Sequence, residues 1–396
     1  MIQNTSIHWN ENDQPREAIW HSENGIAPHK KVVTGDDTLT ADDAYHLACE
    51  GTAILWKGDF QNARQLLQAL VRRIDKPSKK SKRAGKRAVK TDEVAVQKTA
   101  QDIFNQHRLA QSQRARTLGM LLIQCNPDHT IPLRRAPDIT QACQEAYGIV
   151  SESYVVSLRE LLGVISAHEW RKNGLPILAD GDGEPIFVHP HYGVFSPVRG
   201  EYIELVCNAP LPKSWNKDSV AFDIGAGTGV LSIILAMRGV QKMIATDLDD
   251  RALACAKENI ALLNLGSQIE VLKANLFPPG KASLIICNPP WIPARPSSPL
   301  EHAVYDPESQ MLKGFLSGLR DHLLPQGEGW LILSDLAEHL GLRTRPELLA
   351  WIEEAGLEVV GRMDTKPKHP KAFDESDRLH FARAAEITSL WRLSSK

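Results

Sequence analysis

The chain has 396 residues, with 42% hydrophobic and 24% charged residues and a formal net charge of −2. This length exceeds what one hydrophobic core usually serves, so two domains are expected. The near-neutral charge excludes a nucleic-acid or membrane signature spread over the whole chain, and the composition excludes a fibrous or wholly disordered protein.

The cysteines and the N-terminal segment indicate the cellular compartment of the protein. The six cysteines form no CxxC pair and lie mostly in apolar segments, which predicts reduced, buried thiols. Residues 1–20 are polar and do not resemble a signal peptide. No apolar run approaches the roughly 20 residues that span a bilayer. We therefore expect a cytoplasmic protein without a membrane partner.

The first predicted domain, residues 1–180, is expected to be mostly helical and to recognise the substrate. Apolar residues recur at helical spacing in three segments, 42–73, 93–116 and 140–170. Between them, GMLLIQC (119–125) fits a short buried strand or a helix end. The turn-rich sequence LADGDGEPIF (178–187) marks the boundary with a second domain, 186–396.

Residues 72–90 form a basic run inside the first domain. Ten lysines and arginines occur there against a single acid, Asp75, which predicts a solvated loop. A run of this kind gains counterion-release entropy on a polyanion. The basic run therefore favours RNA or DNA over a protein as the binding partner. The alternative is that the run is only a solvated linker.

The second domain alternates strands and helices. Seven apolar or alternating segments read as strands: VAFDI, KMIATD, IEVLKA, SLIICN, GWLILSD, LEVVGRMD and ITSLWRLSS. Helical patterns separate most of them. This alternation predicts an α/β fold, a doubly wound, seven-stranded Rossmann-like sheet with helices on both faces.

The sequence FDIGAGTG follows the first of these strands and opens a helix. Its glycines, Gly225, Gly227 and Gly229, have the spacing GxGxG, and Val230 stands where a dinucleotide site has its third glycine. Asp223 just before the turn disfavours a pyrophosphate. It favours a ligand with cationic groups, and S-adenosylmethionine carries an ammonium and a sulfonium.

Two further polar residues follow the next strands of the domain. Asp247 closes KMIATD and is placed to accept hydrogen bonds from both hydroxyls of a ribose, with Asp249 as its competitor. Asn275 ends the following strand, within reach of an adenine amino group, although a turn-forming asparagine is an equal alternative. Alternatively, Asp223 and Asp247 have only a structural role and cap the turns that follow them.

The fourth strand runs into Asn288, Pro289, Pro290 and Trp291. An amide or aromatic amino nitrogen is a poor nucleophile unless acceptors hold its protons. The Asn288 side-chain oxygen and the Pro289 carbonyl can be those acceptors, and two prolines stiffen the turn. Trp291 can stack on a planar group and orient its nitrogen. Alignment of this kind supplies roughly 7–11 kcal/mol of a barrier, so no general base is required.

Together the two motifs resemble the class I S-adenosylmethionine-dependent methyltransferases, and among them the HemK-type branch and its small-domain N-methyltransferase relatives. The resemblance covers about 190–396. It implies that the target is held by Asn288–Trp291, and that the cofactor is held by Asp223, Gly225, Gly227, Gly229, Asp247 and Asn275. It also implies a gate over the cofactor at YGVFSPVRGEYIEL (192–205), with Phe195 and Pro197 as contacts. The glutamine methyltransferases of this branch usually have NPPY where this chain has NPPW.

We therefore expect an N-methyltransferase that modifies a macromolecule, with base amino groups of RNA or DNA ahead of a protein. One alternative is a HemK-type protein glutamine methyltransferase. Another is a catalytically lapsed cofactor-binding protein that binds nucleic acid, and a third is a small-molecule methyltransferase. No metal is expected, because His189 and His191 have no further ligand cluster beside them.

Overall fold

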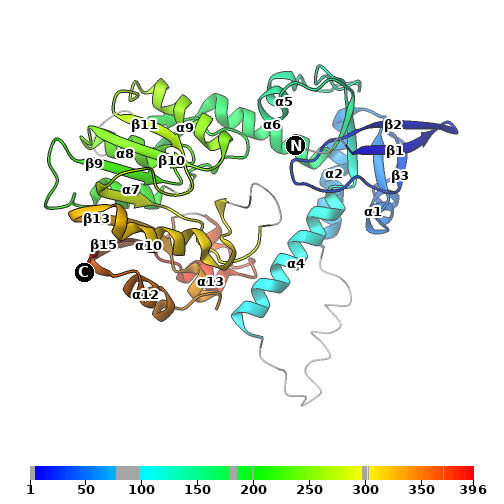
Figure 1. The fold of residues 1–396 in the computed structure, drawn as a ribbon. Helices are drawn as coiled ribbons and strands as arrows, with labels where there is room; N and C mark the ends of the chain where they lie inside the picture. Colours follow the sequence, from blue (N-terminus) through cyan, green and yellow to red (C-terminus); the bar gives the residue numbers. More distant parts are fainter. Residues whose placement is uncertain are drawn as a thin grey trace, which may run out of the picture. The chain divides into compact units, whose positions relative to one another are not determined.

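The computed structural model describes residues 5–76, 98–177, 185–198, 200–296, 301, 303–368 and 370–396. The chain divides into two compact units, Met1–Ser166 and Ala167–Lys396 (Figure 1). Helix α6 (Leu158–Asn173) runs across this division. Most of the expected boundary segment, 178–184, lies outside the described residues.

The first unit is built on a six-stranded sheet, so the expectation of a mostly helical N-terminal domain is wrong. Its strand order is β1-β2-β6-β5-β4-β3, with parallel and antiparallel pairs. The strands are β1 (Ser6–Glu11), β2 (Gln14–Trp20), β3 (Val32–Gly35), β4 (Ala53–Trp56), β5 (Leu121–Cys125) and β6 (Tyr154–Ser157).

The error has two physical causes: β1 and β2 are largely polar, and the buried strands β4 and β6 are short. All four residues of β4 are buried, as are three of the four in β6. A strand buried on both faces has no alternation of polar and apolar residues, and a run of four apolar residues fits a helix equally well. Residues of both strands were therefore assigned to the expected helical segments 42–73 and 140–170.

Four helices of the first unit lie largely inside the expected helical segments, but the one that begins at Thr140 ends at Tyr147, far short of residue 170. Thr40, Asp59 and Thr99 cap three of them, each accepting a hydrogen bond from a backbone N–H of the first turn. The helices are α1 (Ala41–Cys49), α2 (Phe60–Ile74), α4 (Ala100–Leu118) and α5 (Thr140–Tyr147). Of the basic run 72–90, residues 77–90 lie outside the described residues.

The second unit contains a seven-stranded sheet in the order β11-β10-β9-β12-β13-β15-β14, and the α/β class is confirmed. Five neighbouring strands are parallel, and β15 inserts antiparallel between β13 and β14. The strands are β9 (Val220–Ile224), β10 (Lys242–Asp247), β11 (Ile269–Lys273), β12 (Ala282–Cys287), β13 (Leu323–Ser334), β14 (Leu357–Thr365) and β15 (Thr388–Ser395).

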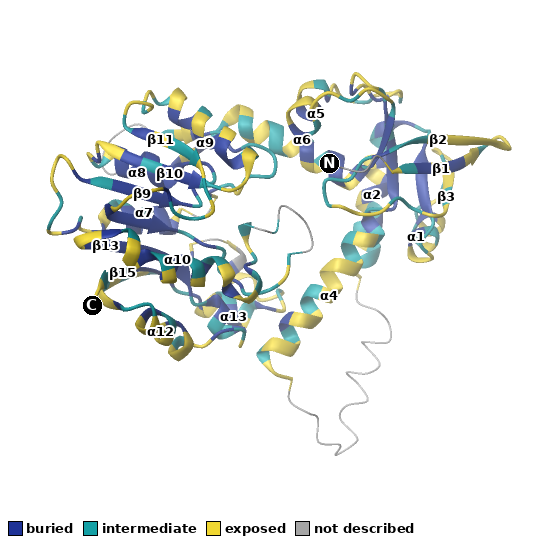
Figure 2. Ribbon diagram, in the orientation of Figure 1, coloured by how far each residue is buried: buried dark blue, intermediate teal, exposed yellow. Residues whose placement is uncertain are grey.

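Helices cover both faces of this sheet and form a separate apolar core on each. Every residue of β12 is buried, and Figure 2 shows the central strands as buried and the outer sides of the helices as exposed. The remaining elements of the unit are the hairpin β7 (Leu175–Ile177) and β8 (Ile186–Val188), the helices α7 (Glu201–Asn208), α8 (Val230–Met237), α9 (Asp250–Leu262), α10 (Gln310–His322), α11 (Leu336–His339), α12 (Arg345–Glu354) and α13 (His380–Ala385), and the short 3-10 turns η2 (Pro307–Ser309) and η3 (Pro370–Phe373).

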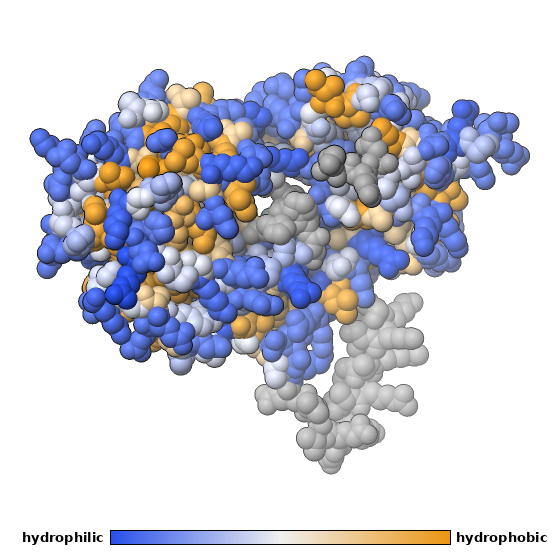
Figure 3. All heavy atoms as spheres, in the orientation of Figure 1, coloured by the Kyte–Doolittle hydropathy of each residue, from blue (hydrophilic) through white to orange (hydrophobic). Residues whose placement is uncertain are grey.

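The surface of the chain is mainly hydrophilic on the face drawn in Figure 3, with apolar side chains gathered over the region of α8 and β10. Among the described helices, none combines the length and the apolar character needed to cross a bilayer. Because β9, β10, β12 and β13 are parallel, their carboxyl ends meet at one edge of the sheet, which is where open α/β sheets bind ligands.

Candidate functional site

A pocket of about 470 Å³ opens at this edge of the second unit. Small-molecule sites usually measure roughly 300–1,000 Å³. Residues of the glycine turn after β9 line one part of the pocket, and the NPPW turn after β12 lines another. Two motifs that are some 60 residues apart in the chain therefore share one cavity, as the resemblance implies.

The glycine turn adopts backbone conformations that side chains disfavour. The φ angles of Gly225, Gly227 and Gly229 are 74°, 56° and 79°, all in the left-handed region. Gly225 and Gly227 line the pocket. A Cβ at Gly225 would lie 2.5 Å from the Met311 side chain, whereas one at Gly227 would meet nothing within 4 Å. Gly229 does not line the pocket; a Cβ there would press on Ala256 of α9.

Asp223 lies beneath the glycine turn and is fully buried. Its Oδ2 accepts hydrogen bonds from the Ser232 backbone N–H at 3.0 Å and from the Ser232 hydroxyl at 2.6 Å. Within the described residues, its Oδ1 is buried and has no hydrogen-bond partner. Burial raises the pKa of Asp223 to about 6, although the bonds from Ser232 lower it. Asp223 does not line the pocket, so its unpaired carboxylate oxygen can attract a cationic group only from behind the lining.

Asp247, at the end of β10, lines the pocket beside the glycine turn. Its Oδ2 accepts a hydrogen bond from the Gly227 N–H and its Oδ1 one from the Asp249 N–H, both at 3.0 Å. Asp247 therefore does cap these turns. Each carboxylate oxygen has about two acceptor sites, so capacity remains for two ribose hydroxyls. Asp249 also lines the pocket, but its carboxylate accepts from the Arg251 N–H and caps α9.

All four residues of the NPPW turn line the pocket. The indole Nε1 of Trp291 donates a hydrogen bond of 2.9 Å to the Asn288 side-chain oxygen. An amide nitrogen cannot accept this bond, so it determines which side of the Asn288 amide faces the indole. Trp291 is half-buried and packs against both apolar cores of the sheet. Its ring is thus held by the fold, and its polar edge orients Asn288.

The segment after the NPPW turn returns to the same pocket. Ile292 forms an isolated bridge with Tyr305, and its carbonyl accepts a hydrogen bond of 2.9 Å from the Asp306 N–H. The buried Asp306 carboxylate in turn accepts bonds from the backbone N–H groups of Met311 (3.0 Å) and Leu312 (3.1 Å). The start of α10 is therefore tied to the turn that carries the candidate acceptors.

The expected gate over the cofactor contributes its first part to the pocket. Phe195 lines the pocket and is exposed, whereas Pro197 is buried and does not line it. Tyr202 of α7 also lines the pocket, and burial together with the nearby Asp223 charge raises the pKa of its hydroxyl well above its usual range. This tyrosine was not singled out from the sequence.

The two histidines ahead of the gate contact protein groups. His191 Nε2 lies 2.8 Å from a carboxylate oxygen of Glu258, and His189 Nδ1 lies 2.6 Å from the Arg171 carbonyl. They therefore tie this segment to α9 and α6. Over the described ranges, no group of three or more His, Cys, Asp or Glu side chains is placed to hold a metal ion.

Asn275 is exposed and does not line the pocket, so its expected adenine contact has no support in the geometry. Sequence reasoning also missed lining residues that come from later elements: Tyr305, Met311, Leu336 and Arg383. Leu336 directly follows the carboxyl end of β13, and the edge rule could have found it. Arg383 lies in a polar stretch without any motif, so no sequence signal marked it.

Comparison with known families gives one match within the second unit. The family model described as "Ribosomal protein L11 methyltransferase (PrmA)" matches residues 206–318. This range contains β9 to β12, the glycine turn and the NPPW turn. The predicted S-adenosylmethionine-dependent methyltransferase class is thereby confirmed for this segment, together with its cofactor. The family it names is not the HemK-type branch.

Curated relatives cover the same part of the chain. Ribosomal protein L11 methyltransferases of Clostridium perfringens (strain SM101) and Clostridium botulinum (strain Eklund 17B) are 32% and 33% identical over 140 residues. Each match covers 31% of this chain, and the chain spans only 44% of the relative's length. A ribosomal protein L11 methylase from Lactobacillus delbrueckii subsp. bulgaricus matches in structure with a TM-score of 0.32 and 20% identity, covering 46% of this chain and 73% of that one.

These relatives correct one expectation. RNA or DNA was placed ahead of a protein as the partner, because of the basic run 72–90 and the NPPW turn. The matching relatives are named for a protein substrate, ribosomal protein L11, so this preference is wrong. The basic run 72–90 belongs to the first unit, and its charge does not indicate which substrate the pocket of the second unit binds.

Proposed function

We propose that the chain is an S-adenosylmethionine-dependent methyltransferase that transfers a methyl group to a planar nitrogen of a protein. The observation that carries this proposal is that one pocket is lined both by the glycine turn with Asp247 and by the NPPW turn. One part suits the cofactor and the other presents hydrogen-bond acceptors to a nitrogen.

The residues of the cofactor half fit S-adenosylmethionine. Asp247, in the pocket lining, keeps acceptor capacity for ribose hydroxyls. The unpaired, buried oxygen of Asp223 lies behind the lining, where its charge attracts a cationic group. Gly227 leaves open space at the turn that a side chain would enter. When bound, the cofactor supplies an electrophilic methyl group on a sulfonium. Phe195 and Tyr202 of the gate region would help to exclude water from it.

The residues of the other half would bind and orient the acceptor nitrogen. The Asn288 oxygen, oriented by the Trp291 indole, retains one acceptor site, and the Pro289 carbonyl provides another. A primary amide has two N–H bonds, so two acceptors fix its plane and direct its nitrogen lone pair at the methyl group. A glutamine or asparagine side chain in a protein fits this arrangement. The protein substrate is favoured by the names of the curated relatives.

The test is methyl transfer to separated cell fractions. The purified chain and S-adenosylmethionine labelled in its methyl group are incubated with protein, RNA and DNA from cells that lack the gene, so that target sites are unmethylated. We expect label in protein, on an amide nitrogen. Asn288→Ala should lower transfer by on the order of a hundredfold, while the calorimetric affinity for S-adenosylmethionine stays unchanged.

The matched control is Asn173→Ala, which removes an exposed asparagine outside the pocket and should leave transfer unchanged. Trp291→Phe keeps an aromatic ring but loses the bond to Asn288, so we expect an intermediate loss of turnover. Label confined to RNA or DNA would refute the protein substrate, and full activity of Asn288→Ala would refute the role of the NPPW turn.

A further inference from the structure

The pocket of the second unit is asymmetric in charge. Among its described lining residues, the charged side chains are Asp247 and Asp249 near the glycine turn and a single cation, Arg383 of α13. The two acids suit the hydroxyls and the cationic groups of the cofactor. The arginine calls for an anionic group, which is either the carboxylate of the cofactor or an anion on a second molecule that enters the pocket.

Arg383 is largely buried and only partly neutralised. Its Nε lies 3.0 Å from the Asp377 carboxylate, and the two side chains are 22% and 13% exposed. Asp377 is the one carboxylate within ion-pair distance of Arg383 in the part of the chain that the structure describes. A guanidinium has five N–H donors in a planar fork. One carboxylate on the Nε side therefore leaves the terminal nitrogens able to bind a second anion.

The backbone that carries Arg383 is fixed to the end of β13. Asp335 and Ile387 exchange two hydrogen bonds, from the Asp335 N–H to the Ile387 carbonyl at 3.0 Å and from the Ile387 N–H to the Asp335 carboxylate at 2.7 Å. The Ser334 hydroxyl also donates a 2.7 Å bond to the buried Glu386. α13 is thereby joined to the strand end that also carries Leu336 in the pocket wall.

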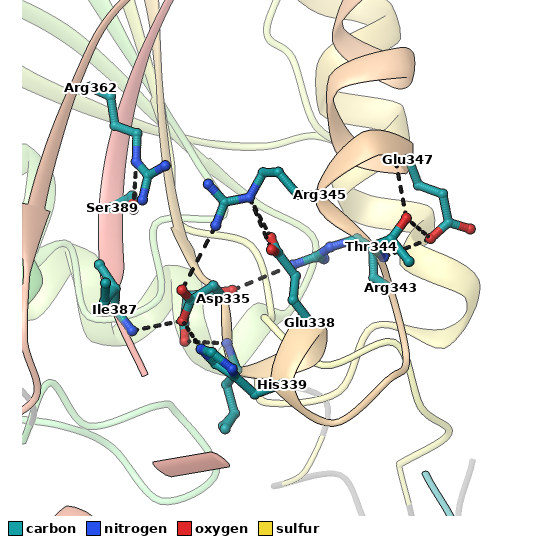
Figure 4. Close-up of polar contacts among 12 residues, drawn as sticks. Asp335, Glu338, His339, Arg343, Thr344, Arg345, Glu347, Arg362, Ile387 and Ser389 are labelled. Carbon is teal, nitrogen blue, oxygen red and sulfur yellow. Dashed lines mark hydrogen bonds and ion pairs between the residues drawn. The ribbon is translucent and has the colours of Figure 1, made fainter. Parts of the chain in front are cut away.

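A network of charges holds this strand end in turn. Figure 4 shows the Asp335 carboxylate between Arg345, His339 and Ile387, with Arg345 also reaching Glu338. The Arg345 Nε lies 2.8 Å from Glu338. Rigid support of this kind lowers the entropy cost of binding a ligand group at a fixed position.

We propose that Arg383 is an anion subsite of the pocket and binds a carboxylate of the protein substrate close to the methylated nitrogen. This inference rests on the proposed function and narrows its substrate to acidic sites: an aspartate, a glutamate or a terminal carboxylate beside the modified residue. The planar fork of arginine matches a carboxylate in bidentate geometry, and its charge persists at every physiological pH.

The first arm of the test uses the wild-type chain alone. Proteins from cells that lack the gene are methylated with labelled S-adenosylmethionine, and the modified peptides are identified by mass spectrometry. We expect a carboxylate within a few residues of every methylated site. Methylated sites without one would overturn the subsite while leaving the proposed function intact. An absence of any label in protein would refute the proposed function, and the subsite with it.

The second arm uses variants of Arg383. Arg383→Gln should raise the KM for the methylated protein about tenfold or more, since it removes a charge-assisted contact. Arg383→Lys keeps the charge and should recover part of the loss, and Arg383→Glu should favour sites flanked by lysine or arginine. Arg378→Gln is the control, because Arg378 is exposed, lies in the same segment and does not line the pocket.

The calorimetric affinity for S-adenosylmethionine separates this subsite from a rival role. The cofactor has a carboxylate of its own, and an arginine that held it would weaken cofactor binding when replaced. Unchanged cofactor affinity in Arg383→Gln, with a raised KM for the protein, supports the proposal. Weakened cofactor affinity, or an unchanged KM, would overturn it.

Discussion

At the scale of single residues, Asp223 is a buried carboxyl group behind the pocket lining. It is fully buried, and one carboxylate oxygen has two hydrogen bonds while the other, among described groups, has none. Desolvation without full compensation explains why its pKa rises to about 6. A cationic ligand would pair with the ionised form only, so binding and ionisation are linked.

This linkage predicts a pH dependence of cofactor affinity. The raised pKa means that Asp223 is protonated below about pH 6 and ionised above it. The calorimetric affinity for S-adenosylmethionine should therefore be constant above this pH and fall by up to about tenfold for each pH unit below it. Asp223→Asn should bind more weakly and lose this dependence. A wild-type affinity that stays flat from pH 5 to pH 8 would contradict an electrostatic coupling between Asp223 and the cofactor.

The sequence predicted the residues of the pocket that belong to short local motifs. Gly225, Gly227, Asp247 and the NPPW turn could be placed together because each follows a parallel strand, and such strands end at one edge. Arg383 could not be placed, since a long irregular stretch leads to it. The sequence analysis also missed the hydrogen bond from Trp291 to Asn288. It predicted that the Trp291 ring stacks on a substrate, whereas its indole N–H binds the side-chain oxygen of Asn288 in the same turn.

At the scale of elements, both the length and the apolar content of a strand decided whether the sequence could predict it; β1 and β2 have six and seven residues but few buried ones, and they were missed. The second unit has amphipathic helices and apolar strands of five or more residues, and their alternation identified an α/β fold. In the first unit, strands of four residues such as β4 (Ala53–Trp56) lie between helices and carry no period of their own. Their pairing is set by contacts with β3 and β5, which are distant in sequence or equally short.

The N-terminus of α10 is the element on which the pocket wall depends most directly. Replacing Asp306 by alanine removes the acceptor for two backbone N–H groups, those of Met311 and Leu312. Loss of a helix cap costs roughly 0.5–2 kcal/mol of folding stability. We expect the midpoint of urea unfolding to fall accordingly, and the tryptophan emission to change as the segment bonded to Ile292 relaxes near Trp291.

Asp321→Ala is the matched control for this prediction, since it removes an exposed aspartate from the same helix. It should leave both the unfolding midpoint and the emission unchanged. If the two variants behaved alike, the hydrogen bonds of Asp306 would contribute nothing to the stability of the pocket wall.

At the scale of the whole molecule, the family model covers part of one unit. The family model matches 206–318, inside the second unit, and does not extend to the six-stranded sheet of the first. The apolar core around Trp9 and Trp20 in the first unit is separate from the two cores that flank the sheet of the second. Each unit therefore has its own source of hydrophobic stabilisation.

Separate cores predict that heat unfolds the full chain in two calorimetric transitions, of which the cofactor shifts one. A ligand that binds only the native second unit stabilises it by RT ln(1 + [L]/Kd), about 2.7 kcal/mol at a hundredfold excess over Kd. S-adenosylhomocysteine, the product of methyl transfer, should therefore raise the transition of the second unit. The transition of the first unit should not move, because its core includes none of the pocket residues.

Amide hydrogen exchange can assign the two transitions, through the protection of β12 and of β5. A single transition that shifts as a whole would show instead that the units unfold together, with the first unit contributing to the stability of the cofactor site.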